Sequence, residues 1–520
     1  MRKITALLLC ICLLLCSFAG CGKQSDEPYV PTGDALVMEG QDPDSVGPQK
    51  EEEPQEFSLA YYPDRGMNPL TSNDYTNRVI FSLIYQNLFN VNADYTVEPI
   101  LCSGYRVSEN YRIWTFLLDD HAYFSDGTPV TAEDVLATYQ AAKAGGYYAG
   151  RFAHVHEMEI SEDGGIRFYL STAYENLPQL LDIPILKAEE VAADKPLGSG
   201  PYILTDSLSG TQLVRNPVWW CGDFEFVVKA SAIHLVEARN PAHIRDEFEF
   251  FDVGLVLADP CSDMYADFRC DYELWDVDNG MMMYIGCNTR YVDFLEDTTL
   301  RSMLTYGINR EKIVNDNFNG YGHAITLPAD PASPYYSKSL AARYAYDSEK
   351  FLAFLGRYGK TEEPIRLLVN ADDSVRLRIA HEIANTFTEF GLPFEVVETT
   401  TARFQQEVYN ANYDLYLGMT KLSSNMDLSP FFAPYGNLSR NGVADATLYS
   451  LCQESLANQG NYYNLHKAVA DDGRIIPIAM FGYAIYATRG MLTDLTPNRD
   501  QVFAYSLGKT MESIRITNTN

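Results

Sequence analysis

The chain has 520 residues, a formal net charge of −31 and 46% hydrophobic residues. This acidic balance argues against a nucleic-acid partner, because such a partner requires a basic face on the protein. By length, residues 57–520 correspond to about three domains, and their apolar content is sufficient for large cores. After the N-terminal segment no apolar run approaches about 18 residues, so we expect no membrane-spanning helix there.

Residues 1–20 have the pattern of a secretory signal. Basic residues at positions 2 and 3 precede an uncharged, mostly apolar run that extends to Phe18. This run is too short and too early for a stable spanning helix. Two small residues then precede Cys21, an order that resembles a bacterial lipobox, which implies that Cys21 is acylated and begins the mature chain. The alternative is an ordinary signal followed by an incidental cysteine.

Residues 21–56 have the composition of a disordered acidic tether. Positions 22–56 hold ten acidic residues, two lysines, five prolines and four glycines, which gives a local charge of −8. Such a segment buries too little apolar surface to offset its ordering entropy. As a flexible coil it would span about 35 Å on average. It would serve as a leash to a membrane or as a solubilising leader.

The segment 111–143 predicts a strand, a turn and a capped helix. Residues 113–118 are rich in β-branched and aromatic types, as in a strand. Residues 125–129, Ser-Asp-Gly-Thr-Pro, have turn chemistry. Thr131 can cap the following helix with Asp134 in the capping-box position. Gly145 and Gly146 then end that helix.

The residue pattern of this segment closely resembles a block of the family 5 extracellular solute-binding proteins. These are the peptide-binding and related receptors of ABC importers. Several further blocks resemble the family in the same order, and together they cover most of residues 57–510. The further blocks lie at 64–70, 85–88, 198–202, 215–220, 288–289, 300–313, 346–359 and 475–478.

The helix predicted after the block at 64–70, and the block at 300–313, have amphipathic patterns. The first predicted helix places five apolar residues on one face, and the second fills positions i, i+3, i+4, i+7 and i+8. The two faces comprise Val79, Ile80, Leu83, Ile84 and Leu88, and Leu300, Met303, Leu304, Gly307 and Ile308.

The resemblance implies an α/β fold of the type II periplasmic-binding-protein class. In this fold two lobes close about a hinge, with a discontinuous domain I and an extra domain. We expect domain I at 57–97, 198–287 and 485–520, domain II at 98–197 and domain III at 288–484. Gly198 and Gly200 would either pivot or pass close to a neighbouring backbone.

Motifs for catalysis, metals and cofactors are weak. His154 and His156 share one face of a predicted strand, as a metal pair can, but no acid or cysteine stands beside them in sequence. His381 and Glu382 lack the second histidine of a zincin. Gly198-Ser199-Gly200 is neither a nucleophile elbow nor a dinucleotide loop. We therefore expect no catalytic residues, no metal and no cofactor.

Six cysteines follow Cys21, too few in so long a chain to form a disulfide framework. We expect mostly buried free thiols, although Cys261 and Cys270 are close enough to pair. The six are Cys102, Cys221, Cys261, Cys270, Cys287 and Cys452.

Residues 418–442 depart from the family pattern where the ligand is recognised. In the peptide-binding members an aspartate of this block pairs with the ligand's α-ammonium, and here Leu422, Ser423 or Ser424 takes that place. Either Asp427 has assumed this role, or the ligand is not a free peptide N-terminus. From the family blocks and this segment we expect ligand contacts at Asn68, Tyr85, Asn288, Asn425, Asp427, Tyr435, Arg440 and Asn441.

The sequence therefore predicts an extracytoplasmic, lipid-anchored substrate-binding subunit of an ABC importer. It would bind a small molecule or short peptide and deliver it to the permease subunits. An envelope-tethered hydrolase is the alternative from another class. The same fold could also serve signalling, or bind a sugar or a metal chelate.

Overall fold

The computed structural model describes residues 57–208, 210–222, 226–259, 268–358, 363–434, 436–438, 443–492 and 494–516. The predicted signal, Cys21 and the acidic tether lie outside these ranges, as do Cys261, Tyr435, Arg440 and Asn441. Residues 54–520 form one compact unit. Of the helices in the described ranges, none has the length and apolarity needed to cross a membrane.

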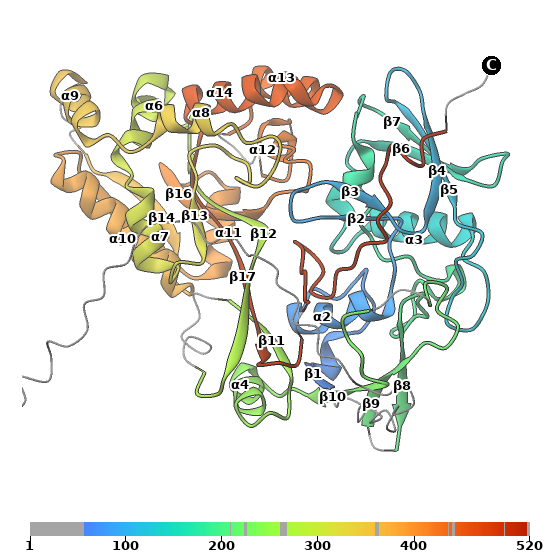
Figure 1. Cartoon of the computed structure of the whole chain (residues 1–520). Coiled ribbons are helices and arrows are strands. Elements are labelled where there is room, and N and C mark those ends of the chain that lie inside the picture. Colours follow the sequence, from blue (N-terminus) through green and yellow to red (C-terminus); the bar gives the residue numbers. More distant parts are fainter. Residues whose placement is uncertain are drawn as a thin grey trace, which may run out of the picture. The chain divides into compact units, whose positions relative to one another are not determined.

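Eleven of the described strands form one mixed sheet (Figure 1). The short β13 (Gly322–Ala324) pairs with β17 outside the main path. Along that path the order is β15 (Phe394–Thr399), β14 (Ile365–Asn370), β16 (Leu415–Lys421), β12 (Tyr272–Cys287), β17 (Ile475–Thr488), β11 (Leu255–Ala258), β1 (Phe57–Tyr61), β10 (Ala232–Glu237), β9 (Gly210–Arg215) and β8 (Tyr202–Ser207).

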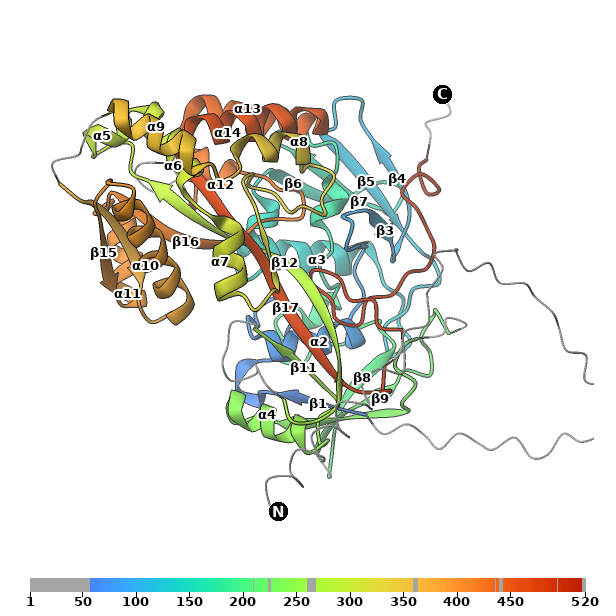
Figure 2. The same cartoon turned by 60° about the vertical axis from the view of Figure 1, so that its left-hand side comes forward.

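Strands β12 and β17 form a long antiparallel ribbon that joins the two ends of this sheet (Figure 2). The ribbon register shifts between Asp278 and Met281, which marks a bulge in β12. Gly482 of β17 lies opposite this bulge, and a Cβ at this glycine would overlap the carbonyl group of Val277. The two backbones therefore approach each other more closely here than a side chain would allow.

A separate four-stranded sheet has the order β4 (Cys102–Val107), β5 (Ile113–Leu118), β7 (Ile166–Leu170) and β6 (Val155–Ile160). Strand β5 has the predicted bounds, and α3 (Ala132–Ala144) follows it. Thr131 and Asp134 form the predicted capping box. Tyr139 of α3 packs on Phe168 of β7 at 5.9 Å between ring centroids, so the helix covers one face of this sheet. Strands β2 (Phe89–Val91) and β3 (Val97–Pro99) form a hairpin.

The remaining helices pack mainly around the large sheet. They are α2 (Tyr75–Ile84), α4 (Pro241–Glu249), α5 (Asp293–Glu296), α6 (Thr298–Gly307), α7 (Arg310–Asn317), α8 (Lys338–Ala341), α9 (Ser348–Tyr358), α10 (Ser374–Glu389), α11 (Thr401–Tyr409), α12 (Ser429–Phe432), α13 (Ala446–Ala457) and α14 (Tyr462–Asp472).

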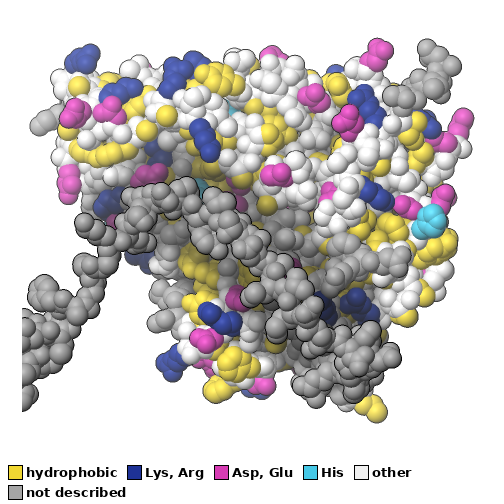
Figure 3. Space-filling view, in the orientation of Figure 1, with side chains coloured by type: hydrophobic (Ala, Val, Ile, Leu, Met, Phe, Trp, Pro, Cys, Tyr) yellow, Lys and Arg dark blue, Asp and Glu magenta, His cyan; other side chains and the backbone are white. Residues whose placement is uncertain are grey.

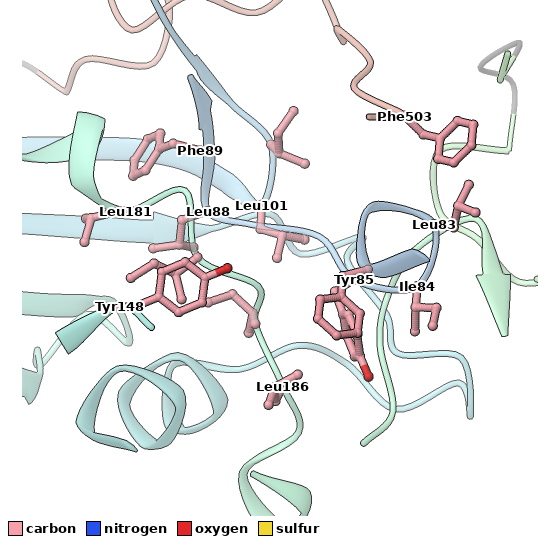
Figure 4. Packing of buried hydrophobic residues seen from close by; sticks show 14 of the residues in the cluster. Leu83, Ile84, Tyr85, Leu88, Phe89, Leu101, Tyr148, Leu181, Leu186 and Phe503 are labelled. Atoms are coloured by element: carbon pink, nitrogen blue, oxygen red, sulfur yellow. The ribbon is translucent and has the colours of Figure 1, made fainter. Parts of the chain in front are cut away.

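Helix α2 is shorter than the apolar pattern predicts. It ends at Ile84, because Tyr85 is extended and the chain then forms a bridge from Asn87 to Pro184. Leu88 is nevertheless fully buried, in the core cluster of Figure 4. Ile308 likewise follows the end of α6 in an extended conformation. In both cases tertiary contacts bury the predicted residue without a helix.

Gly198 passes close to a neighbouring backbone, which is one of its two predicted roles. A Cβ there would overlap the carbonyl oxygen of Ile84, and Gly200 N donates to the same oxygen at 2.8 Å.

The cysteines within the described ranges are free thiols, and Cys102, Cys287 and Cys452 are buried. Burial raises the pKa of each of these three thiols. On the face shown in Figure 3, acidic and basic side chains are interspersed.

The substitution Gly482→Ala is expected to lower the free energy of unfolding by at least about 3 kcal/mol, because the new methyl group meets backbone rather than a movable side chain. Gly356→Ala in α9 is the matched control, since no atom lies within 4 Å of its Cβ position. It should stabilise the protein by about 0.5–1 kcal/mol. Urea denaturation measures both, and equal effects would contradict the close crossing.

His466 of α14 should make stability depend on pH. Burial lowers its pKa to about 4 from an ordinary value of 6.5. Between these values the unfolded chain binds a proton that the folded chain does not, so stability falls as the pH decreases. The loss from this group between pH 7 and 4 is about 3 kcal/mol. His466→Leu should remove this part of the loss in denaturation experiments, whereas His121→Leu, at an exposed position, should keep it.

Candidate functional site

A cavity of about 530 Å³ lies between two stretches of chain that are far apart in sequence. This volume falls in the range of about 300–1,000 Å³ that is typical of small-molecule sites. The first stretch comprises residues 147–172 around β6. The second runs from Lys421, the last residue of β16, to Tyr449, and Arg499 completes the lining. The lining residues are Tyr147, Gly150, Arg151, Ala153, His154, Ser171, Thr172, Lys421, Leu422, Ser423, Asp427, Ser429, Pro430, Phe431, Ala433, Gly436, Asn437, Leu438, Tyr449 and Arg499.

His154 and Asp427 connect the two stretches directly. His154 Nε2 lies 3.0 Å from Asp427 Oδ2, and both side chains are largely buried. Asp427 Oδ1 accepts a hydrogen bond of 2.8 Å from the backbone N–H of Ser429 at the start of α12. Both carboxylate oxygens of Asp427 therefore have partners within the protein.

The loop that carries Asp427 is held by hydrogen bonds. Asn425 Oδ1 accepts from the hydroxyl group of Ser423 at 2.6 Å and from the backbone N–H of Asp427 at 3.3 Å. The hydroxyl group of Tyr462 donates to the carbonyl oxygen of Asn425. Met426 adopts a positive φ of 54°, which turns the chain before α12.

A cluster of buried charges forms another wall of the cavity. Lys421 Nζ donates to Asp500 and, at 2.8 Å, to the hydroxyl group of Tyr147. Arg151 pairs with Asp182 and, at 3.2 Å, with Asp500. Of these residues, Lys421, Arg151 and Tyr147 line the cavity, whereas Asp182 and Asp500 do not.

Burial and these contacts together shift the pKa of Asp500, Asp182 and Lys421. Burial alone would raise the pKa of Asp500, but Lys421, Arg151 and Arg499 hold it well below its usual range. Burial raises the pKa of Asp182 to about 6 despite the charge of Arg151. Burial also lowers the pKa of Lys421, although Asp500 opposes this change.

Arg499 is the third cation at this wall. Its guanidinium donates to the carbonyl oxygen of Leu422 and, at 3.4 Å, to the hydroxyl group of Tyr95. Tyr95 in turn donates to Asp330 at 2.7 Å. No described residue accepts a hydrogen bond from Arg499 Nε, which lies 3.7 Å from Asp500 Oδ2.

Three of the predicted ligand contacts lie away from the cavity lining. Asn68 donates to the carbonyl oxygens of Val191 and Ala193, and Asn288 donates to those of Ala411 and Tyr413. The hydroxyl group of the buried Tyr85 meets the carbonyl oxygens of residues 67 and 196. In the structure these three side chains hold neighbouring loops in place.

Of the other predicted contacts, Asp427 lines the cavity. Asn425 does not, but its side chain accepts a hydrogen bond from the backbone N–H of Asp427. Tyr435, Arg440 and Asn441 belong to the residues that the structure does not describe. Within the described ranges, no group of three or more histidine, cysteine or carboxylate side chains could hold a metal. The exposed His156 does not join His154 at the cavity.

Sequence reasoning missed Lys421, Arg151 and Arg499. A signal for Lys421 was available, because it is a lone charge that follows the apolar run of β16. Arg151 lies in a short 3-10 helix, Ala149–Phe152, and Arg499 lies outside regular elements, so only the fold brings them to Lys421.

Comparison with known proteins places the fold in a defined family. The family model for bacterial extracellular solute-binding proteins, family 5 Middle, matches residues 96–442. The nickel-binding periplasmic protein of Escherichia coli (strain K12) is 25% identical over 334 residues, which cover 59% of this chain and 62% of that relative.

Two solved structures have similar folds. The substrate-binding protein CtaP of an ABC transporter from Listeria monocytogenes superposes with a TM-score of 0.73 at 18% identity, covering 87% of this chain and 98% of that one. The oligopeptide-binding protein AppA from Bacillus subtilis, in complex with a nonapeptide, gives 0.63 at 17% identity, covering 86% and 98%. Because the family model matches well over half of the chain, this protein belongs to family 5 of the bacterial extracellular solute-binding proteins, which are receptors of ABC importers and not enzymes.

Proposed function

We propose that this protein is the lipid-anchored substrate-binding subunit of an ABC importer that captures a short peptide and delivers it to a membrane permease. The observation that carries the proposal is the cavity enclosed by residues 147–172 and 421–449. Two distant stretches of one chain that converge on a common cavity are the arrangement required for a ligand to be enclosed between lobes.

Contacts across the cavity support closure of the two stretches around a ligand. Besides the pair of His154 and Asp427, Thr172 meets Gln453 and Lys421 meets Tyr147. These contacts are polar, so ligand or water can replace them when the two stretches separate. Separation must also break a buried link of Asp500 to Arg151 or Lys421, which opposes opening. Asp427 remains a proposed ligand contact, together with Tyr435, Arg440 and Asn441.

The domain division is part of the proposal. Domain I would comprise 57–97, 198–287 and 485–520, domain II would comprise 98–197, and domain III would comprise 288–484. The four-stranded sheet, residues 102–170, falls inside the proposed domain II. The ribbon of β12 and β17 spans proposed domains I and III, which makes its bulge at Asp278–Met281 a candidate pivot.

Anchoring by Cys21 and release of residues 1–20 would place the receptor at the outer face of the cell membrane. The acidic composition of residues 21–56 suits a leash between that anchor and the folded unit.

Peptide capture can be tested by native mass spectrometry of the full chain in detergent, before and after incubation with a mixed pool of short peptides. We expect retained or acquired peptide masses, because the cavity has the volume and polar lining of a small-ligand site. Denatured protein is the control for nonspecific adducts. A folded protein that never carries a peptide mass would contradict the peptide assignment.

Lipid attachment predicts a specific effect of Cys21→Ala. The variant should lose the acyl mass in intact-protein mass spectrometry and move from the membrane fraction to the soluble or secreted fraction, because acyl chains supply the anchoring free energy. Cys10→Ala, inside the predicted signal, is the matched control and should leave both readouts unchanged. Membrane retention of the Cys21 variant would contradict the anchor.

A further inference from the structure

The cavity wall has an asymmetric distribution of charge. Among the described residues, three cationic side chains, Arg151, Lys421 and Arg499, line the cavity together with one carboxylate, Asp427. The carboxylates that neutralise the cations, Asp182 and Asp500, lie behind them and outside the lining. A ligand in the cavity therefore meets the positive ends of these ion pairs first.

The single lining carboxylate is already engaged. Asp427 accepts from Ser429 N–H at 2.8 Å through one oxygen and lies 3.0 Å from His154 through the other. Its side chain is 10% exposed. A ligand ammonium would have to share this carboxylate with His154 and the Ser429 N–H, and it would also lie in the field of three cations.

The cations, in contrast, retain donor capacity. An ammonium group has three N–H donors, and Lys421 uses two of them on Tyr147 and Asp500. Its side chain remains 22% exposed while it lines the cavity. Arg499 also lines the cavity, but its Nε, which has no hydrogen-bond acceptor among the described residues, is enclosed by protein atoms.

We propose that the cavity binds its ligand through an acidic group, which sits against Lys421 and Arg499. This inference rests on the proposed receptor function and names the chemical class of the ligand, a small organic acid that includes a peptide bound by its carboxylate end. Charge-assisted hydrogen bonds from ammonium and guanidinium groups to a carboxylate are the strong polar contacts that such a site supplies.

The apolar lining fixes the other end of the ligand. Leu422, Pro430, Phe431 and Leu438 lie on the cavity wall contributed by the second stretch, and Ala433 adds a small apolar surface there. An acid head at Lys421 therefore leaves the rest of the ligand against an apolar surface, where burial contributes about 25 cal/mol per Å².

The rival assignment is recognition of an α-ammonium by Asp427. The two assignments make opposite predictions for chemically blocked ligands, so the ligand side of the experiment can be varied without altering the protein. One short-peptide pool is prepared in three forms: with free termini, with amidated C-termini and with acetylated N-termini. A set of non-peptide small carboxylic acids and a set of small phosphate esters complete the probes.

Each probe set is incubated with the full chain in detergent and read by native mass spectrometry and thermal shift. We expect acetylated and unblocked peptides to bind equally and amidated peptides to be lost. Binding of the carboxylic acids alone would identify a non-peptide acid, and binding of the phosphate esters would identify a phosphorylated one. Both results would keep the acidic group and replace the peptide.

Variants of the protein test which residue binds the acidic group of the ligand. Lys421→Met should weaken binding of the selected acid by roughly 30-fold or more, because it removes a largely buried charge partner. Lys421→Arg should restore much of this loss. Lys467→Met is the matched control, since Lys467 pairs with Asp471 on α14 and does not line the cavity. If Lys421→Met does not fold, the three peptide forms still decide the question.

The outcomes separate the two proposals. If amidated peptides bind and acetylated peptides do not, binding through an acidic group is overturned and the receptor function stands. An unchanged affinity for the acid in a folded Lys421→Met variant would have the same meaning. A protein that binds no probe of any charge, and carries no ligand mass when purified from cells, would overturn the receptor function and this inference with it.

Discussion

The buried carboxylate of Asp500 connects three parts of the chain that are remote in sequence. It accepts from Lys421 at the end of β16, pairs with Arg151 from the segment after α3, and lies 3.7 Å from Arg499 beside it. Each of these charges would be costly to bury alone, by several kcal/mol per ion, so each depends on the others. The elements that carry them are held in one arrangement, and the position of the cavity wall follows from it.

The family relationship and the cavity answer different questions about the function. The family fixes the fold and the receptor role, whereas the ligand depends on the side chains that line one cavity. In this chain Lys421, the last residue of β16, lines that cavity together with Asp427. The charge of the cavity wall, and not the fold, therefore indicates the chemical class of the ligand.

Local elements with strong chemistry could be predicted from the sequence, and the strand at 113–118 and the helix capped by Thr131 are confirmed. The end of α2 could not be predicted, because the bridge from Asn87 to Pro184 replaces the last predicted turn. The residues that line the cavity were the hardest feature to predict from the sequence. Asp427 could be named from its block, but Arg151 lies in a 3-10 helix of four residues and Arg499 lies in a loop, and neither segment carries a periodic signal.

The close crossing of β12 and β17 has a mechanical consequence. Sliding the strands by one residue would bring a side chain to the crossing of Gly482 and Val277, where a Cβ does not fit, so this contact opposes shear of the ribbon. The bulge at Asp278–Met281 lies at the same level and interrupts the regular ladder. A pivot at this level, as proposed above, would therefore turn the two ends of the ribbon relative to each other rather than slide the strands.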